Sequence, residues 1–254
     1  MPITDSFDDT SPEIIHARDL VDAVPGFPDV AIATFATRTL ALMRDEFALT
    51  PLTIIEDGTG HIDVWAYDDP AGHRFAVYGS PMGAPFAVTT LEHLVAFGAS
   101  KFVFFGECGV LDASIPSGHI IVPTSAYRDE GTSYHYAPAA DWIDIPTAAK
   151  TQQFLRDAGV PHVAGKVWTT DAFFRETRAV VERRRQAGCI AVDMECSALA
   201  AAAAWRDVSV YQFLTAADNL DAETWDSRVL GKMPAEPRLA YARVALELAR
   251  RIAT

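Results

Sequence analysis

The chain of 254 residues is 50% hydrophobic and 22% charged, a balance typical of a soluble globular enzyme with a substantial core. Its net charge of −13 argues against a nucleic-acid or membrane-surface partner, because phosphate groups would be repelled. Its 3 cysteines lack the spacing of a metal site, and no apolar run is long enough to cross a membrane. We therefore expect a cytoplasmic protein that binds no metal, no nucleic acid and no membrane.

Residues 1–25 are predicted to form a peripheral N-terminal segment with one short helix over residues 11–21, which has Pro12 at its first position. Beyond this segment, apolar strands alternate with helical stretches. Strands are predicted over residues 30–35, 62–67, 75–78, 101–105, 118–123, 162–168, 190–192 and 208–214. Helices are predicted over residues 39–47, 87–97, 147–158, 175–187, 195–206 and 236–252. This order indicates one α/β domain over residues 1–254, in which a central mixed, largely parallel twisted sheet is flanked by helices.

The segment from residue 190 to residue 199 carries the strongest functional signal. An apolar run ends there at Asp193-Met194-Glu195, and an alanine-rich helix follows. Two carboxylates at positions i and i+2 of an extended segment point the same way, so both can accept hydrogen bonds from neighbouring hydroxyl groups of one ligand. An acidic cap at the start of a buried helix explains the same spacing equally well.

Other polar or glycine-containing segments also follow predicted strands, namely residues 106–109, 129–132 and 169–173 together with Asp218. Ligands of parallel α/β sheets bind beyond the carboxyl ends of the strands. We therefore expect these segments to share a pocket with residues 193–195, although every enzyme of this class places its loops at that edge.

Asp193-Met194-Glu195 resembles the signature of the nucleoside phosphorylase/nucleosidase family, in which the methionine and the second carboxylate hold the ribose. Four further blocks resemble the family and occur in its order: SPMGAP (80–85), GASKFVFFGECG (98–109), TTDAFFRET (169–177) and TAADN (215–219). Residues 118–136 are closest to uridine-phosphorylase-like members. The resemblance implies the fold of this family and cleavage of the N-glycosidic bond of a nucleoside.

The resemblance also assigns roles to individual residues. Glu195, with Met194 and Asp193 beside it, would hold the ribose. Phe173 would stack on the base, and Asp218 would act as a general acid at the leaving base if burial raised its pKa. Without the resemblance, an aspartate in a loop or helix cap explains Asp218, and a core aromatic explains Phe173.

Two further segments bear on the substrate. Thr132 lies in a polar loop after a predicted strand, where it would line the site or support a subunit contact. Pyrimidine-specific members carry a glutamine and an arginine just after the stacking aromatic, whereas this chain has Arg175 and Glu176 and no glutamine. Together with Asp218, this difference favours a purine nucleoside.

The resemblance fails at the phosphate site. The family has an arginine on the strand before its Gly-x-x-Gly turn, a threonine or serine inside that turn, and a glycine after its first strand. The corresponding residues here are Phe104, Glu107 and Phe35. A carboxylate about 4 Å from a phosphate repels it by roughly 1–4 kcal/mol, which would weaken phosphate binding severely.

Three functions are therefore compatible with the sequence. The primary prediction is a phosphorylase with inorganic phosphate as co-substrate and no other cofactor. The amides of Gly83 and Gly109 would then bind the phosphate, helped by Arg38, Arg74 or an arginine of a second subunit. The first alternative is a nucleoside hydrolase in which Glu107 activates water, although Glu107 could instead pair with an arginine. The second alternative is a non-catalytic nucleoside-binding protein. The family implies a homo-oligomer, based on dimers and extending up to a hexamer.

Overall fold

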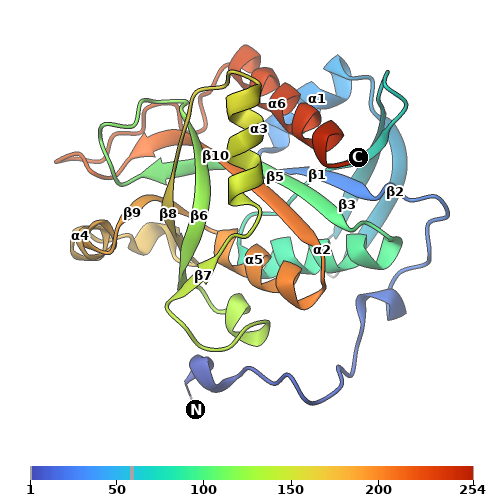
Figure 1. Cartoon of the computed structure of the whole chain (residues 1–254), viewed down its shortest axis with the longest axis horizontal. Helices are drawn as coiled ribbons and strands as arrows, with labels where there is room; N and C mark the ends of the chain where they lie inside the picture. The colour runs from blue at the N-terminus through green and yellow to red at the C-terminus, as the bar shows by residue number, and fades with distance from the viewer. Residues whose placement is uncertain (1, 58–59, 254) are drawn as a thin grey trace.

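The computed structural model describes residues 2–57 and 60–253 and contains a mixed β-sheet between two layers of helices (Figure 1). The strands are β1 Val30–Thr34, β2 Thr50–Asp57, β3 Gly60–Asp68, β4 Arg74–Gly79, β5 Lys101–Val110, β6 Ile120–Asp129, β7 Trp142–Asp144, β8 His162–Thr170, β9 Cys189–Asp193 and β10 Ser209–Asn219. The α-helices are α1 Thr37–Glu46, α2 Ala84–Phe97, α3 Ala148–Asp157, α4 Arg178–Gln186, α5 Cys196–Trp205 and α6 Ala235–Ala253. The predicted α/β fold class is confirmed.

Parallel pairing dominates the centre of the sheet. The strands follow the order β10-β6-β8-β9-β5-β1-β4-β3-β2, and β10 also pairs with β5. The pairs β4–β1, β1–β5, β5–β10, β6–β8 and β8–β9 are parallel, whereas β2, β3 and β4 form an antiparallel edge. Because β9 returns to the end of β5 and β10 also pairs with β6, the strands β5, β10, β6, β8 and β9 close into a ring. Residues from β5, β9 and β10 are thereby brought together at one end.

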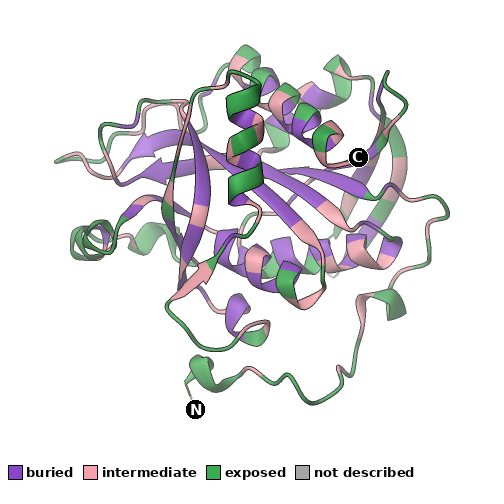
Figure 2. Cartoon of the chain, in the orientation of Figure 1, coloured by how far each residue is buried: buried purple, intermediate pink, exposed green. Residues whose placement is uncertain are grey.

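Alternate residues of the central strands pack against different helical layers. Ile32 and Val103 belong to a core with residues of α1, α3 and α6, whereas Ala33 and Phe104 belong to a core with residues of α2 and α5. Figure 2 shows the central strands buried between helices whose outer faces are exposed. A strand that is buried on both faces needs apolar residues at consecutive positions, as the run in β5 shows.

Several strands are longer than the sequence indicates, and the extensions of β5 and β10 contain predicted site residues. Residues 106–109, predicted as a turn, are part of β5, and Asp218, predicted in a loop, lies in β10 opposite Gly109. The pairing of β5 with β10 continues to Val110 because the buried backbone groups of each segment find hydrogen-bond partners in the other. Strand β2 was not predicted; it pairs with β3 at the sheet edge, where most of its side chains are not buried.

The predicted helix over residues 11–21 is wrong. From residue 2 to residue 25, the only helical elements are the 3-10 turns η1 Ile3–Asp5 and η2 Ala17–Asp19, and this segment runs along the outside of the molecule (Figure 1). Ile14, Ile15 and Leu20 are 97%, 68% and 70% exposed, so the apolar side chains of the predicted helix form no buried face. A short helix without a buried apolar face is unstable in water. None of the helices in the described parts of the chain is both long and apolar enough to cross a bilayer.

Candidate active site

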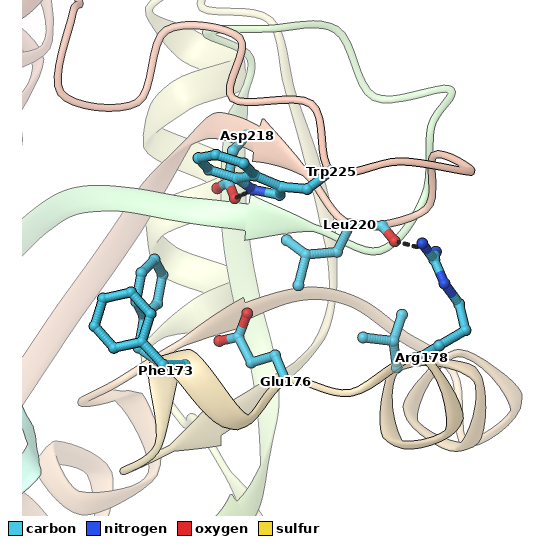
Figure 3. A pocket seen from close by; sticks show the side chains of 8 residues that line it. Phe173, Glu176, Arg178, Asp218, Leu220 and Trp225 are labelled. Carbon is cyan, nitrogen blue, oxygen red and sulfur yellow. Dashed lines mark hydrogen bonds between the residues drawn. The ribbon is translucent and has the colours of Figure 1, made fainter.

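Two adjoining cavities open where β5, β9 and β10 end. The first has a volume of about 350 Å³ and is lined by both Glu195 and Asp218, with Glu107 between the two strands that carry them. The second, of about 370 Å³, shares Asp218 and extends toward Trp225 (Figure 3). Each volume falls within the range of about 300–1,000 Å³ that small-molecule sites occupy. The structure therefore brings the two central predicted residues into one cleft.

The turn from β9 into α5 forms one wall of the first cavity. Asp193 accepts hydrogen bonds from the amides of Glu195 (2.9 Å) and Cys196 (2.6 Å) and from the hydroxyl of Thr169 (2.8 Å). Its carboxylate thus satisfies backbone groups at the start of α5, as the helix-cap interpretation predicts. Met194 and Glu195 also line the cavity. Asp193 fixes this turn, and Glu195 is the carboxylate with capacity left for a ligand.

Glu195 is held from a distant part of the chain. One oxygen of its carboxylate accepts a hydrogen bond of 2.6 Å from the amide of Gly83, which precedes α2. Gly83 has φ of 98°, a conformation that favours glycine over residues with a Cβ. The amide predicted to bind phosphate is therefore already occupied by the carboxylate predicted to bind ribose.

Burial raises the pKa of both carboxyl groups at this turn, and their mutual repulsion raises that of Glu195 further. Asp193 accepts three hydrogen bonds from protein donors, so it is the better location for the negative charge. Glu195 is only 6% exposed and has few competing contacts. A vicinal diol of a sugar would supply the donors and acceptors that its carboxyl group lacks.

The other end of the cleft is formed by β10 and β5. One carboxylate oxygen of Asp218 accepts a hydrogen bond of 2.8 Å from the indole of Trp225, and burial raises the pKa of Asp218 above its usual range. Gly109 lies opposite it in the β5–β10 pairing. A Cβ at Gly109 would come within 2.5 Å of Leu220 and 3.2 Å of the Asp218 carboxylate. Gly109 therefore allows Asp218 to approach the strand closely, which is a different role from the predicted phosphate contact.

Phe173 lies in the 3-10 turn η4 Phe173–Arg175, lines both cavities and is 38% exposed. The core interpretation of this ring is therefore wrong. Phe174 packs edge-on against it, with the ring centroids 5.0 Å apart, and is 93% exposed. An exposed aromatic pair at the mouth of a cavity offers a flat apolar surface to a ligand.

Sequence reasoning did not identify Glu176 as a site residue. Its side chain points into the second cavity between Phe173 and Leu220, on the side facing Asp218 (Figure 3). Burial, with a smaller contribution from the charge of Asp218, raises the pKa of Glu176 to about 8. The sequence signal that could have identified Glu176 is a carboxylate directly after the Phe-Phe-Arg run, in the segment where pyrimidine-specific members carry a glutamine and an arginine.

The region expected to bind phosphate is built differently. Glu107 forms an ion pair of 2.9 Å with Arg238 of α6, and both side chains are largely buried. Arg238 also donates to the hydroxyl of Thr39 (3.1 Å) and to the carbonyl of Met233 (3.0 Å). Its Nε and Nη1 groups are thus already engaged by protein acceptors. Glu107 is paired with an arginine, as one interpretation of the sequence anticipated.

Aromatic rings occupy the other two phosphate positions. Phe35 stacks on Phe104 with the ring centroids 5.8 Å apart, and Phe104 is buried. Of the arginines considered as replacements, Arg74 pairs with Asp68 at the beginning of β4, away from the cleft. Arg38 is exposed and does not line either cavity.

Thr132 is not brought into the cleft. It belongs to the turn η3 Thr132–His135 and lines neither cavity. The neighbouring Glu130 accepts hydrogen bonds from the amide of Ser133 (3.0 Å) and the hydroxyl of Ser197 (2.9 Å), so this loop is fixed against α5. Within residues 2–57 and 60–253, no three His, Cys, Asp or Glu side chains are grouped so that they could hold a metal ion.

Comparison with known proteins agrees with this architecture. The family model of the phosphorylase superfamily matches residues 51–251. The chain belongs to the phosphorylase superfamily. This membership confirms the resemblance recognised in the sequence and covers all residues that line the cleft except those near β1.

Individual relatives are more distant. The chain is 29% identical over 159 residues to a DeoD-type purine nucleoside phosphorylase of Bacillus cereus, and 31% identical over 157 residues to an uncharacterized protein of Acanthamoeba polyphaga mimivirus. These matches span 59% and 61% of this chain and only 65% and 62% of the two relatives, less than two thirds of each. The crystal structure of an AMP nucleosidase from Bacteroides thetaiotaomicron superposes with a TM-score of 0.68 and 19% identity, covering 90% of this chain and 91% of that one. That similarity shows the fold.

Proposed function

We propose that this protein cleaves the N-glycosidic bond of a nucleoside, preferably of a purine, and that water is the acceptor that its geometry favours. The observation that supports water is the Glu107–Arg238 ion pair, which places an engaged carboxylate on the wall of the cavity that also contains Glu195. Phosphate, the acceptor expected from the sequence, would meet this carboxylate and the ring of Phe35, which stacks on the buried Phe104.

The ribose lies at the Glu195 end of the cleft in this proposal. Glu195 and Met194 hold the sugar, and hydrogen bonds from its hydroxyls to the carboxylate strengthen as positive charge develops on the ring. The base lies beside Phe173 and within reach of Asp218. Since burial raises the pKa of Asp218, this group can retain the proton that a ring nitrogen of the leaving base needs.

The bond between the anomeric carbon and the base nitrogen breaks, and its electron pair leaves with the base, which receives a proton from Asp218. A water molecule forms the new bond to the anomeric carbon and gives up a proton to the Glu107 carboxylate. The products are a free base and a free sugar. Proton exchange with solvent then returns the proton to Asp218 and removes the proton from Glu107. The ion pair with Arg238 holds the Glu107 carboxylate in one position for this role.

Product analysis tests the acceptor directly. Adenosine, inosine and uridine are each incubated with the protein, once without phosphate and once with phosphate in about 10-fold excess over the nucleoside. The free base, ribose and ribose 1-phosphate are then quantified. We expect purine release at a rate that phosphate does not change, with ribose as the sugar product. Formation of ribose 1-phosphate would overturn the choice of water, and saturable binding without turnover would overturn the enzymatic proposal.

Phosphorolysis is the second candidate, supported by the name of the purine nucleoside phosphorylase relative. Glu107→Thr separates the two acceptors, because it removes the negative charge and introduces a hydroxyl at the position where the family has one. Under the hydrolase proposal, this variant loses water-dependent turnover. A gain of phosphate-dependent turnover in the same variant would show that charge repulsion is the obstacle to phosphate.

We also propose a cytoplasmic homo-oligomer, based on dimers and extending up to a hexamer, as the resemblance implies. Met82, Phe174 and Trp225 are large apolar residues exposed around the cleft, at 67%, 93% and 59%. A second copy could cover part of this rim. Light scattering after gel filtration measures the state, and a monomer at micromolar concentration would contradict the proposal.

A further inference from the structure

A third cavity, of about 480 Å³, lies at the ends of β5 and β10 opposite to the cleft. Its walls come from α3, from the last turns of α6 and from the first residues of the two strands. Helices α3 and α6 cover the same face of the sheet (Figure 1). Lys101 of β5 lines this cavity and Glu107 lines the cleft, so at about 3.3 Å per residue the two sites are roughly 20 Å apart. The cavity is separate from the cleft, and its volume suits a small molecule.

The third cavity carries positive charge in an acidic protein, and we call it the basic cavity. Of the described residues that line it, Lys101, Lys150 and Arg251 are cationic, and Asp157 alone carries a carboxylate. The whole chain has a net charge of −13, and the charged residues described around the first cavity of the cleft are all carboxylates. A cavity lined mainly by charges of one sign concentrates ions of the opposite sign. The basic cavity therefore favours an anion, which the cleft repels.

The carboxylates near this cavity leave one of its ends free of negative charge. Lys150 lies in the first turn of α3 and Asp157 in the last, about 10 Å apart along the helix axis. The carboxylate of Asp157 accepts a hydrogen bond of 2.6 Å from the amide of Gln153. Lys101 lies 3.5 Å from the carboxylate of Asp29, in an ion pair that is partly exposed to solvent. An anion is therefore favoured most at the Lys150 end.

Two hydroxyl groups of β10 lie at the same end. Tyr211 lines the basic cavity although it is only 5% exposed, and Ser209 lines it from the same side of the strand. Neither hydroxyl forms a hydrogen bond with another described residue. The first turn of α3 is fixed beside them, because the hydroxyl of Thr147 donates to the carbonyl of Val210 (2.5 Å). A buried hydroxyl without a partner is unfavourable, and an acceptor on a ligand would satisfy it.

We propose that the basic cavity binds an organic phosphate, with the phosphate group at the Lys150 end and the apolar part of the ligand against Phe154, Leu248 and Ile252, which line the rest of the cavity. A phosphate group offers three acceptor oxygens, enough for a lysine ammonium and two hydroxyls together, whereas a carboxylate offers two. The apolar side chains give a carbon-containing ligand more contact than inorganic phosphate can make. The proposal is independent of the function proposed for the cleft, because the two sites share no residue.

Calorimetry with phenyl phosphate tests the ligand class, since this probe has neither a sugar nor a nucleobase for the cleft. We expect one molecule to bind per chain, about tenfold more tightly than benzoate or inorganic phosphate. Affinity should fall as the salt concentration rises from about 50 to about 300 mM, because salt screens the lysine charges. Equal affinity for benzyl alcohol, which has the ring without the charge, would overturn the proposal, and so would the absence of phenyl phosphate binding at millimolar concentration.

Two variants assign that binding to the basic cavity. Lys150→Gln removes an exposed charge and should weaken phenyl phosphate binding about tenfold, while Tyr211→Phe removes only a hydroxyl and should weaken it about threefold. Lys232→Gln is the matched control, because it makes the same change at an exposed lysine that lines none of the three cavities. Melting temperatures establish that each variant folds. Unchanged affinity in Lys150→Gln would overturn the assignment, and an equal loss in Lys232→Gln would overturn it by showing that binding follows net charge alone.

Discussion

The proposed sugar end and the proposed acceptor end of the cleft each contain a carboxylate, but the two carboxylates are fixed in different ways. Glu195 is held by a backbone amide, and the turn that carries it is stabilised by the neighbouring Asp193. Glu107 is held by the side chain of Arg238, which comes from the last helix. The proposed sugar end therefore depends on backbone contacts, whereas the proposed acceptor end depends on one ion pair between side chains that are distant along the chain. We therefore expect substitutions to separate substrate binding from acceptor choice.

The largest expected effect concerns the acceptor end. Arg238→Met would leave the Glu107 carboxylate buried without its partner, which typically costs about 3–5 kcal/mol of unfolding free energy. At roughly 2–4 °C per kcal/mol for a chain of this size, the melting temperature should fall by about 6–20 °C. The double variant Arg238→Met/Glu107→Leu should recover most of that loss. A loss below about 1 kcal/mol in the single variant would show that solvent screens the pair.

At the sugar end, Glu195→Ala should reduce kcat/KM for ribonucleosides on the order of 100-fold, because hydrogen bonds that strengthen in the transition state are lost. Unchanged circular dichroism would establish that the variant folds. A 2′,3′-dideoxynucleoside lacks the diol, so the same substitution should cost much less with that substrate. Equal losses with both substrates would place the diol elsewhere.

Asp218→Asn tests the group that is proposed to protonate the leaving base. Turnover of a purine nucleoside should fall more than about tenfold, since general acids contribute at least that much. Burial raises the pKa of Asp218, and in the proposed mechanism the protonated form is the active one, so wild-type kcat should decline as pH rises through that pKa. The variant should lack this decline. A nucleoside with a positively charged base needs no proton, and its cleavage should be affected little.

The smallest effect is a pH dependence of stability at Glu176. Its pKa rises from 4.5 to about 8 on folding, so the unfolded chain releases this proton first, and stability is lost as pH increases between these values. Glu176→Gln does not titrate and escapes the loss. Its melting temperature relative to wild type should therefore increase from pH 5 to pH 8, by a few degrees at most because the side chain is partly solvated, and remain constant above pH 8. A difference that is flat from pH 5 to pH 9 would contradict the raised pKa.

Much of the fold was readable because apolar periodicity is a local property of the chain. Helix α2 and strands β1 and β5 lie where the pattern predicts them, although β5 extends further. The N-terminal segment was misjudged because its pattern resembles a helix, but its apolar residues Ile14, Ile15 and Leu20 are exposed and form no buried face. Edge strand β2 was missed because side chains that are only partly buried leave a weak pattern.

The features of the cleft also divide into those that the sequence predicts and those that only the structure reveals. The sequence by itself determined the α/β order of elements and the turn Asp193-Met194-Glu195, because both depend on neighbouring residues. Only the tertiary structure decided that Arg238 pairs with Glu107, that Gly83 holds Glu195, and that Glu176 faces Asp218. Ion pairs and cavity walls join segments that are distant along the chain, and the packing that brings them together leaves no signature at either segment alone.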